Sequence, residues 1–260
     1  MGDINQFDDV LTKEFLEREY IQKQKNDYLI AFEVGCGKST VHRYRSRFGI
    51  AARNQGLVVH LSRKNTFNLT RETKDYIDGL LLGDGCLVSQ SKFSARLTQD
   101  FSIKREQWAN EIESYFQRVG ITSHIVKKVR ENRVTRDCFI RGGKAVRLTT
   151  LNYEEFHVFW ERWYNEKKFI PHDINVLSPW LLANWYMGDG SRATHGGITM
   201  CTNSFSKEDL VFLVEQLKSA LGFKFTIHKR AMLYLKKRYV DLFLEYIAPF
   251  KVSCFNYKWS

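Results

Sequence analysis

The chain has 260 residues, of which 43% are hydrophobic and 14% aromatic, so it can form one large or two modest packed domains and is not a disordered chain. Forty Lys and Arg against 29 Asp and Glu give a net charge of +11, an excess that favours a polyanionic partner or an anionic membrane surface. No apolar run approaches the roughly 20 residues of a membrane-spanning helix, which makes a membrane the weaker candidate.

The first nine residues and the cysteines indicate the compartment. Residues 1–9 carry neither the positive charge nor the apolar stretch of a signal peptide. The cysteines are odd in number and never in CxxC spacing, at positions 36, 86, 138, 201 and 254. We therefore expect a reducing compartment, cytoplasmic or an organellar matrix, rather than secretion.

Residues 34–40 read VGCGKST and contain the Gly-Lys-Ser of a phosphate-binding loop. Such a loop needs a glycine five positions before the Gly-Lys pair, but Phe32 stands there. The preceding residues also carry apolar side chains at helical spacing, where the loop would require a strand. An ATP site is therefore the weaker interpretation of this segment.

The same segment fits a helix-turn-helix better. One helix is predicted from Asp27 to Gly35, and a second from its N-cap Ser39 to Phe48. We assign residues 1–55 to a DNA-binding module in which the second helix enters the major groove. The outer face of that helix is formed by Lys38, Ser39, His42, Arg43 and Arg47. A basic helical hairpin that does not bind DNA is the alternative.

Two similar segments follow a polar, weakly periodic linker, which we place at residues 56–70. DYIDGLLLGDG at 75–85 and WLLANWYMGDG at 180–190 are both apolar helices that end in Gly-Asp-Gly. Each begins the same predicted order of elements, αββαββα, in a first half (71–172) and a second half (173–260). The fold class is therefore α+β, preceded by a small all-α module.

The remaining elements are predicted in a similar order in both halves, but only one strand is placed before the middle helix of the second half. In the first half we expect strands at 86–88 and 94–98, a helix at 105–119, strands at 121–129 and 137–148, and a helix at 154–165. In the second half we expect a strand at 197–202, a helix at 206–221, strands at 223–228 and 232–235, and a helix at 240–247. Ser206 and Asp209 form a capping box, and Ser178 with Pro179 fixes the start of the second apolar helix.

The paired Gly-Asp-Gly ends are candidates for a metal site. One apolar helix ending in Asp-Gly is an ordinary capped helix, so only the pairing makes Asp84 and Asp189 notable. A carboxylate at a helix C-terminus is disfavoured by ~0.3–1 kcal/mol, and two such ends side by side favour a divalent cation. We predict an Mg²⁺ site, which Mn²⁺ is also expected to fill, formed by both carboxylates and the carbonyls of Gly83 and Gly188.

The nine-residue stretches IDGLLLGDG (77–85) and LANWYMGDG (182–190) resemble the two signature motifs of single-chain LAGLIDADG homing endonucleases. The resemblance covers residues 70–260 and implies two pseudo-symmetric halves whose signature helices meet at the interface. It implies that each half presents a saddle-shaped antiparallel sheet to the major groove. It also implies a monomer that binds a long, pseudo-palindromic or asymmetric site in double-stranded DNA and cuts both strands, leaving 3′ overhangs.

The resemblance also implies roles for individual residues. Asp84 and Asp189 would each bind metal and cut one strand. Lys168 and Lys258 match the family's active-site lysines, which stabilise charge on the phosphate or organise the attacking water. The alternative for both lysines is a phosphate contact or a solvated surface charge.

Two positions depart from the signature. Asn184 replaces a glycine and Asp78 replaces an alanine. Gly79 and Gly83 lie four residues apart on one helix face, and Asn184 and Gly188 occupy the matching places, so we expect the helices to pack closely. A buried Asp78 would need a partner that the sequence does not identify.

Two basic windows fall on predicted sheet. Residues 121–150 carry eight basic and two acidic side chains, and residues 222–240 carry six basic and none acidic. Such a sheet can present one face to the core and the other to DNA, although a plain solvated face is the alternative. The predicted DNA contacts are Arg96, Lys127, Arg130, Arg133, Arg136, Arg141, Lys144, Arg147, Lys224, Lys229, Arg230 and Lys236.

Two other functions use a similar scaffold. One is a transcription regulator whose active site has decayed, and the other is a maturase that assists intron RNA splicing. The presence of both Asp84 and Asp189 argues against decay. Binding to structured intron RNA would identify a maturase.

Overall fold

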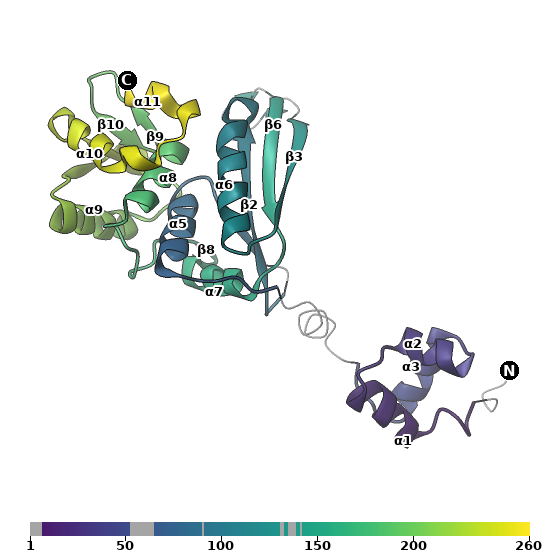
Figure 1. Ribbon diagram of the computed structural model, residues 1–260. Helices are drawn as coiled ribbons and strands as arrows, with labels where there is room; N and C mark the ends of the chain where they lie inside the picture. Colours follow the sequence, from purple (N-terminus) through teal and green to yellow (C-terminus); the bar gives the residue numbers. More distant parts are fainter. Residues whose placement is uncertain (1–6, 53–64, 90, 131–132, 135–138, 141) are drawn as a thin grey trace. The chain divides into compact units, whose positions relative to one another are not determined.

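The computed structural model describes residues 7–52, 65–89, 91–130, 133–134, 139–140 and 142–260. The chain forms two compact units, residues 1–58 and 59–260 (Figure 1). Residues 56–64 of the predicted linker lie outside the described residues. In the part of the chain that is described, no helix has the length and apolar character needed to cross a membrane.

The N-terminal unit is a small helical bundle with its own core. Its elements are α1 (Lys13–Leu16), the π-helical η1 (Glu17–Gln22), α2 (Asp27–Val34) and α3 (Lys38–Arg47). Asn26 caps α2 by accepting a hydrogen bond from Leu29 N at 2.8 Å. Gly35 ends α2 at a φ of 72°, a left-handed conformation that glycine adopts readily. The core is closed by Leu11, Leu16, Ile30, Ala31, Val41 and Tyr44.

The second helix of this unit begins earlier than the sequence analysis predicted. Ser39 is its second residue and not its N-cap, which is Gly37 in an extended conformation. The Gly37 carbonyl accepts the first helical hydrogen bond, from Thr40 N at 2.9 Å. Glycine is itself a favoured N-cap, so the turn needs no serine there.

The first half of the larger unit has the predicted αββαββα order. Its helices are α5 (Arg71–Leu82), α6 (Glu106–Arg118) and α7 (Glu154–Trp163). Its main strands are β1 (Cys86–Ser89), β2 (Ala95–Ser102), β3 (Ser123–Arg130) and β6 (Gly143–Thr150), which form an antiparallel sheet in the order β1-β2-β6-β3. Two-residue strands form two separate pairs, β4 (Arg133–Val134) with β5 (Phe139–Ile140), and β7 (Tyr164–Asn165) with β8 (Lys167–Lys168).

The second half repeats this order with shorter strands. Its elements are α8 (Pro179–Asp189), β9 (Gly190–Arg192), β10 (Ile198–Met200), α9 (Lys207–Leu221), β11 (Phe225–His228), β12 (Met232–Leu235), α10 (Val240–Ile247) and a terminal α11 (Asn256–Trp259). The strands form an antiparallel sheet in the order β11-β12-β10-β9. The predicted capping box at Ser206 and Asp209 and the Ser178 cap of α8 are both present.

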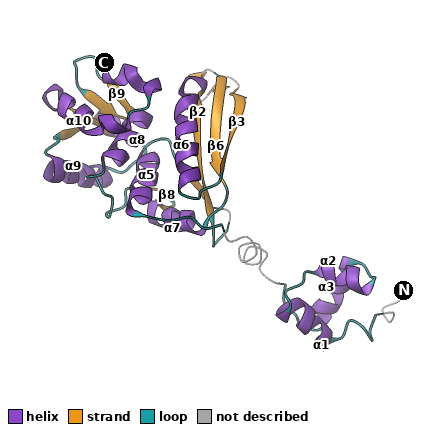
Figure 2. Cartoon of the chain, viewed as in Figure 1, coloured by secondary structure: helices purple, strands orange, loops and turns teal. Residues whose placement is uncertain are grey.

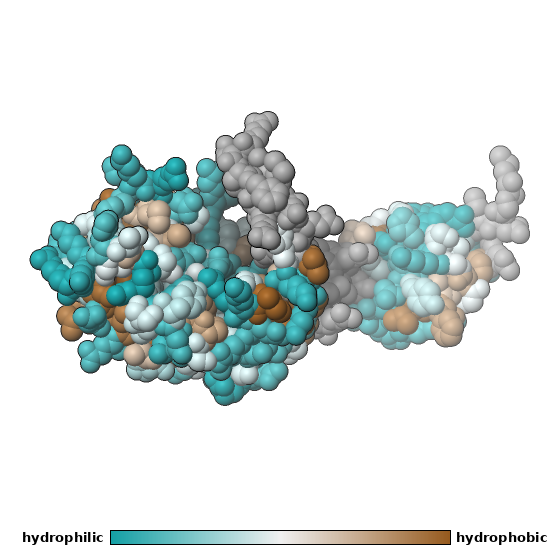
Figure 3. Space-filling view, turned by 90° about the horizontal axis from the view of Figure 1, so that it is seen from above, coloured by the Kyte–Doolittle hydropathy of each residue, from teal (hydrophilic) through white to brown (hydrophobic). Residues whose placement is uncertain are grey.

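Each sheet has one covered face. In the first half, α6 lies along the sheet (Figure 2), and the residues of β2 that face it, Ala95, Leu97, Gln99 and Phe101, are all buried. The alternate residues of β2 are more exposed. In Figure 3, hydrophilic side chains cover most of the visible surface of the larger unit.

The two halves meet through α5 and α8, which share one hydrophobic core. A methyl group added to Gly79 would lie 2.6 Å from the Leu181 carbonyl oxygen and 2.8 Å from Leu181 Cα, so only glycine allows this approach. Asn184, which replaces the signature glycine, is buried and donates to the Tyr76 carbonyl at 3.3 Å. The amide therefore uses its polar group to join the two helices.

Asp78 is fully buried and has partners that lie far away in the sequence. Arg162 donates to both of its carboxylate oxygens, at 2.5 and 2.9 Å, and Trp163 Nε1 donates at 2.8 Å. Both residues belong to the end of α7. The departure from the signature alanine is thus part of a charged network that ties α7 to the interface helix.

Candidate active site and nucleic-acid interface

Asp84 and Asp189 lie at the C-terminal ends of α5 and α8, where the two backbones touch. A methyl group on Gly188 would lie 3.5 Å from Gly83 Cα and 3.6 Å from Asp84 N. Helix α8 runs to Asp189 itself, whereas α5 ends at Leu82 and Asp84 follows in the turn before β1. Asp84 is exposed and Asp189 is partly buried. The two carboxylates therefore converge but are not equivalent.

The electrostatics of this pair favour a cation. Burial, followed by the charge of Asp84, raises the pKa of Asp189 from its usual range to about 7. Among the described residues, no group of three or more His, Cys, Asp or Glu could hold a metal. A cation at the pair would therefore complete its shell with backbone carbonyls, water and a substrate phosphate. That oxygen-only, partly aqueous shell is the one Mg²⁺ prefers, so the residues present fit this ion.

Lys168 and Lys258 both bind backbone carbonyls near the carboxylates. Lys168 Nζ donates to Gly85 O at 2.9 Å and, more weakly, to Gly83 O at 3.4 Å. Lys258 Nζ donates to Met187 O at 2.7 Å. Burial lowers the pKa of both lysines to about 8, so each remains mostly protonated at neutral pH. The two lysines therefore place positive charge near the carboxylates, but not at equivalent positions. Lys168 binds the carbonyls of the residues on either side of Asp84, whereas Lys258 binds the carbonyl two residues before Asp189.

Arg105, which the sequence analysis did not single out, lies beside the second carboxylate. It ends the short helix η2 (Ile103–Arg105) of the first half. Its guanidinium and the Lys258 ammonium both lie over the Phe255 ring, 5.3 and 5.1 Å from the centroid. After burial, Arg105 is the largest influence that lowers the pKa of Lys258. In the second half, Ser206 occupies the corresponding position before α9, so the two halves differ in charge at this position.

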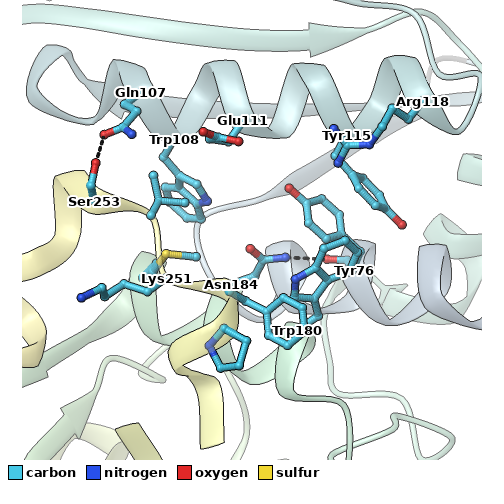
Figure 4. A pocket seen from close by; sticks show the side chains of 14 residues that line it. Tyr76, Gln107, Trp108, Glu111, Tyr115, Arg118, Trp180, Asn184, Lys251 and Ser253 are labelled. Atoms are coloured by element: carbon cyan, nitrogen blue, oxygen red, sulfur yellow. Dashed lines mark hydrogen bonds between the residues drawn. The ribbon is translucent and has the colours of Figure 1, made fainter. Parts of the chain in front are cut away.

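A pocket of about 500 Å³ lies between α6 and residues 249–253 of the second half (Figure 4). Tyr76, Tyr115 and Trp180 line one end, with the two tyrosine rings stacked at 3.9 Å. At the other end Ser253 donates a hydrogen bond to Gln107 at 2.8 Å. Its lining includes neither Asp84 nor Asp189, so this pocket is separate from the carboxylate pair.

The open face of the first sheet carries a cluster of charged side chains. Asp100 on β2, Arg147 on β6 and Val126 on β3 are direct cross-strand neighbours. Arg147 donates to Asp100 at 2.7 and 2.9 Å, and Lys128 donates to the same carboxylate at 2.9 Å. Arg96 lies on the same face of β2, four residues before Asp100. Arg96 and Arg147 were predicted from the sequence, whereas Lys128 was missed.

Lys127, one of the predicted DNA contacts, lies on the other side of the sheet from Arg147. Strand alternation places it on the helix-covered side, where it pairs with Glu106 at the start of α6, at 2.7 Å. Its neighbour Lys128 points to the open face. Lys144 pairs in register with Val129 and so also has the helix-side orientation, although it is exposed at the end of β6. The number of basic residues indicated which strands carry them, but only the pairing register shows which face of the sheet each side chain lies on.

The open face of the second sheet is mainly neutral and polar. It carries Ser191, Thr199, Thr226, His228 and Tyr234. Ser191 and Thr199 share a hydrogen bond of 2.7 Å, and His228 bonds Thr226 at 3.1 Å. A count of charges could not find these residues, although alternation along the predicted strands could have. The predicted basic residues of this half are all exposed, at Lys224, Lys229, Arg230 and Lys236.

Four predicted contacts fall in the segment between β3 and β6. Arg136 and Arg141 lie outside the described residues. Arg130 and Arg133 belong to strands, but their side chains are not among those described. In the N-terminal unit, the five predicted residues of α3 are all exposed: Lys38, Ser39, His42, Arg43 and Arg47. Arg47 also pairs with Asp8 at 3.0 Å.

Comparisons with known proteins agree with this architecture. The model of the LAGLIDADG DNA endonuclease family matches residues 74–243. An uncharacterized protein of Methanocaldococcus jannaschii is 33% identical over 93% of this chain and 96% of its own. The cytochrome b mRNA maturase bI2 of Debaryomyces hansenii is 27% identical over 73% of this chain and 74% of its own.

The structure also has a solved neighbour. The homing endonuclease I-WcaI, bound to its DNA recognition sequence, matches with a TM-score of 0.61 and 17% identity over 80% of this chain and 94% of its own. This similarity concerns the fold, and the family match covers well over half of the sequence. With two αββαββα halves joined through paired Gly-Asp-Gly helices, the chain belongs to the LAGLIDADG DNA endonuclease family.

Proposed function

We propose that the protein is a site-specific endonuclease that hydrolyses one phosphodiester bond in each strand of a DNA duplex and leaves 3′ overhangs. The observation that carries this proposal is the convergence of Asp84 and Asp189 at the contact between α5 and α8. Two carboxylates, one from each half, match the two strands of a duplex. One chain supplies both, so the proposed active species is a monomer.

The residues of the chain have separate roles in this proposal. Asp84 and Asp189, with the carbonyls of Gly83 and Gly188, would hold Mg²⁺, and Mn²⁺ is expected to replace it. When bound, the metal would activate water and offset charge on the phosphate. Lys168 and Lys258 place ammonium groups beside the carboxylates, where they stabilise the additional negative charge of the transition state or orient the attacking water.

DNA recognition would come from the open sheet faces and the N-terminal unit. The charged face of the first sheet and the hydroxyl-rich face of the second would each contact one half of a long site. The exposed basic side chains of α3 would add contacts to flanking DNA in the manner of a helix-turn-helix. Net positive charge would support binding through release of counterions from the phosphates.

The test combines site selection with cleavage. Randomised duplex DNA is selected for binding in Ca²⁺, and selected sites are then incubated with Mg²⁺ or EDTA. We expect a staggered double-strand cut in Mg²⁺ only. Asp84→Asn and Asp189→Asn should each bind the site but fail to make the double-strand cut. Tight binding without cleavage in either Mg²⁺ or Mn²⁺ would contradict the nuclease proposal and favour a DNA-binding regulator.

The similarity to a cytochrome b mRNA maturase favours RNA splicing assistance as a second candidate. That function requires binding to structured intron RNA but not the two carboxylates. The same purified protein is therefore tested for binding to structured intron RNA. RNA binding that Asp84→Asn and Asp189→Asn leave unchanged, together with no DNA cleavage, would select the maturase.

A further inference from the structure

The row formed by Asp100, Arg147 and Val126 crosses three adjacent strands of the first sheet on its open face. Val126 is 51% exposed. Arg147 is 49% exposed, and Asp100, at 27%, is more sheltered. The row therefore presents a fixed charged group and an apolar group to whatever covers this face.

Arg147 is held at its base by two parallel hydrogen bonds. Its Nε donates to Asp100 Oδ1 at 2.7 Å and its Nη2 donates to Oδ2 at 2.9 Å. Lys128 donates a further hydrogen bond to Oδ2 of the same carboxylate, at 2.9 Å. The hydrogen bonds from Arg147, the stronger influence, and from Lys128 keep the pKa of Asp100 well below its usual range. The carboxylate is therefore charged, and the arginine fixed, across the physiological range.

This arrangement leaves the far end of the guanidinium for a second partner. An arginine has five N–H donors, and the two bonds to Asp100 use Nε–H and one Nη2–H. The remaining donors lie on Nη1 and Nη2 in a fork that matches two adjacent acceptors. In the major groove, O6 and N7 of guanine present such a pair, and this is the commonest specific contact of arginine.

We propose that Arg147, positioned by Asp100, specifies one guanine in the half-site bound by the first sheet. This inference rests on the proposed function, because it requires that the open face binds duplex DNA. It assigns sequence discrimination to one residue in a surface where other basic groups contact phosphate. Asp100 acts through Arg147 and is a positioning residue.

A phosphate contact and a cross-strand ion pair are the alternatives for Arg147. A phosphate contact would give affinity without base preference. An ion pair that only supports the sheet would give neither. Fixing the guanidinium by a bidentate carboxylate is unnecessary for a phosphate, which accepts donors from many directions, but a guanine requires one plane and one direction. The geometry therefore favours base recognition.

The experiment begins with selection of binding sites from randomised duplex DNA in Ca²⁺ by the full chain. The selected site is then varied at each position to all four bases, and affinities are measured for the unmodified protein and variants. We expect one position at which guanine is favoured by about 5- to 150-fold, the discrimination typical of a bidentate contact. Arg147→Ala should abolish that preference and leave the preferences at distant positions unchanged.

Two further variants separate recognition from charge. Arg147→Lys keeps the charge but cannot form the planar fork, so it should lose the guanine preference while binding the other three bases about as well as the unmodified protein does. Asp100→Asn should weaken the preference at the same position. Lys144→Ala is the control on the same strand: its side chain has the helix-side orientation, so this variant should retain the guanine preference. Because each preference is a ratio within one sample, a partly unfolded variant does not change the result.

The outcomes distinguish this inference from the proposed function. If no sequence is selected, both fail. If a site is selected but Arg147→Ala and Arg147→Lys retain every base preference, the inference is wrong and the endonuclease proposal stands. If Arg147→Ala lowers affinity equally for all four bases at every position, Arg147 is a phosphate contact and the inference is again wrong.

Discussion

The chemical roles of three aspartates in the larger unit follow from their immediate partners. Asp78 is fully buried between Arg162 and Trp163 and is structural. Burial and, secondly, the negative charge of Asp84 raise the pKa of Asp189 to about 7. Asp100 lies between two cations on an open face. Aspartate thus has three different roles in this unit: it stabilises the helix interface, forms part of the proposed metal site and positions an arginine for the proposed recognition of DNA.

The network around Asp78 gives a prediction about stability. Asp78→Ala would leave Arg162 largely buried without its main partner, and we expect a loss of about 3–5 kcal/mol in the free energy of unfolding. Urea unfolding followed by tryptophan fluorescence measures this loss. Asp173→Ala is the matched control, because Asp173 pairs with the same arginine but is 60% exposed, and it should cost less than about 1 kcal/mol. Equal losses of stability in Asp78→Ala and Asp173→Ala would contradict the conclusion that the buried pair of Asp78 and Arg162 is the one that stabilises the fold.

Arg105 gives a prediction about the two strands. Arg105 lies near Asp189 and Lys258. Arg105→Ala should therefore slow the cut that depends on Asp189 by about tenfold or more and leave the cut that depends on Asp84 nearly unchanged. Duplexes labelled on one strand or the other separate the two rates. Lys104→Ala, which removes an exposed neighbouring charge, should affect the two strands equally. Equal slowing of both strands by Arg105→Ala would show that its charge acts on DNA binding as a whole.

Glu19 in the N-terminal unit predicts a pH dependence. Hydrogen bonds from Lys23, Lys25 and Arg18 lower its pKa to about 2. A carboxyl whose folded-state pKa is depressed contributes stability above its unfolded pKa, near 4.5, and loses that contribution as the pH falls towards 2. Hydrogen exchange of residues 13–50, corrected for the intrinsic rate, should therefore be faster in Glu19→Gln than in the unmodified chain at pH 6. The difference should vanish near pH 2, and a constant difference would be evidence against this ion cluster.

At the scale of elements, the interface helices depend on one glycine. Gly79→Ala should favour the isolated helix by ~1 kcal/mol, but its methyl group would lie 2.6 Å from the Leu181 carbonyl oxygen. We expect the clash to dominate and the unit to lose about 1–3 kcal/mol of stability. Chemical denaturation checks this result. At Gly143, where an added methyl meets nothing within 4 Å, Gly143→Ala should change stability by less than about 0.5 kcal/mol.

Local signals were sufficient to predict most elements of the two halves. The bounds of β12 and α10 agree with the prediction to the residue, and the capping box placed the start of α9. Strand β9 was missed because its three residues are too few to show an alternating pattern. The side of the sheet on which Lys127 lies could not be predicted, because the number of charges along a strand does not tell which face a side chain points to, whereas the pairing register does.

The partners of the site residues could not be predicted in the same way. Arg162 is 84 residues from Asp78, and Arg105 belongs to the opposite half from the carboxylate it affects. Such contacts depend on how complete elements cross, and no short sequence pattern records that crossing. The repeated Gly-Asp-Gly ends were recognisable because the two copies carry the same local signal and only their packing had to be inferred.

At the scale of the whole molecule, the two compact units predict separate contributions to DNA binding and cleavage. The carboxylates and lysines of the proposed active site all belong to residues 59–260, whereas the exposed basic face of α3 belongs to the N-terminal unit. Removing charge from α3 should therefore change how tightly the DNA is held and leave the chemical step intact.

The variant that tests this separation is Lys38→Ala combined with Arg43→Ala. If both side chains contact phosphate, affinity should fall and the slope of log K against log salt should become shallower by about 0.9 for each lost contact. Cleavage at saturating protein should be unchanged. Lys13→Ala, compared with Lys38→Ala alone, removes the same charge from the same unit but outside α3. If this control lowers the affinity and the salt slope as much, the net charge and not the exposed face of α3 accounts for the effect. If the α3 variant slows cleavage at saturating protein, the two units are coupled during the reaction.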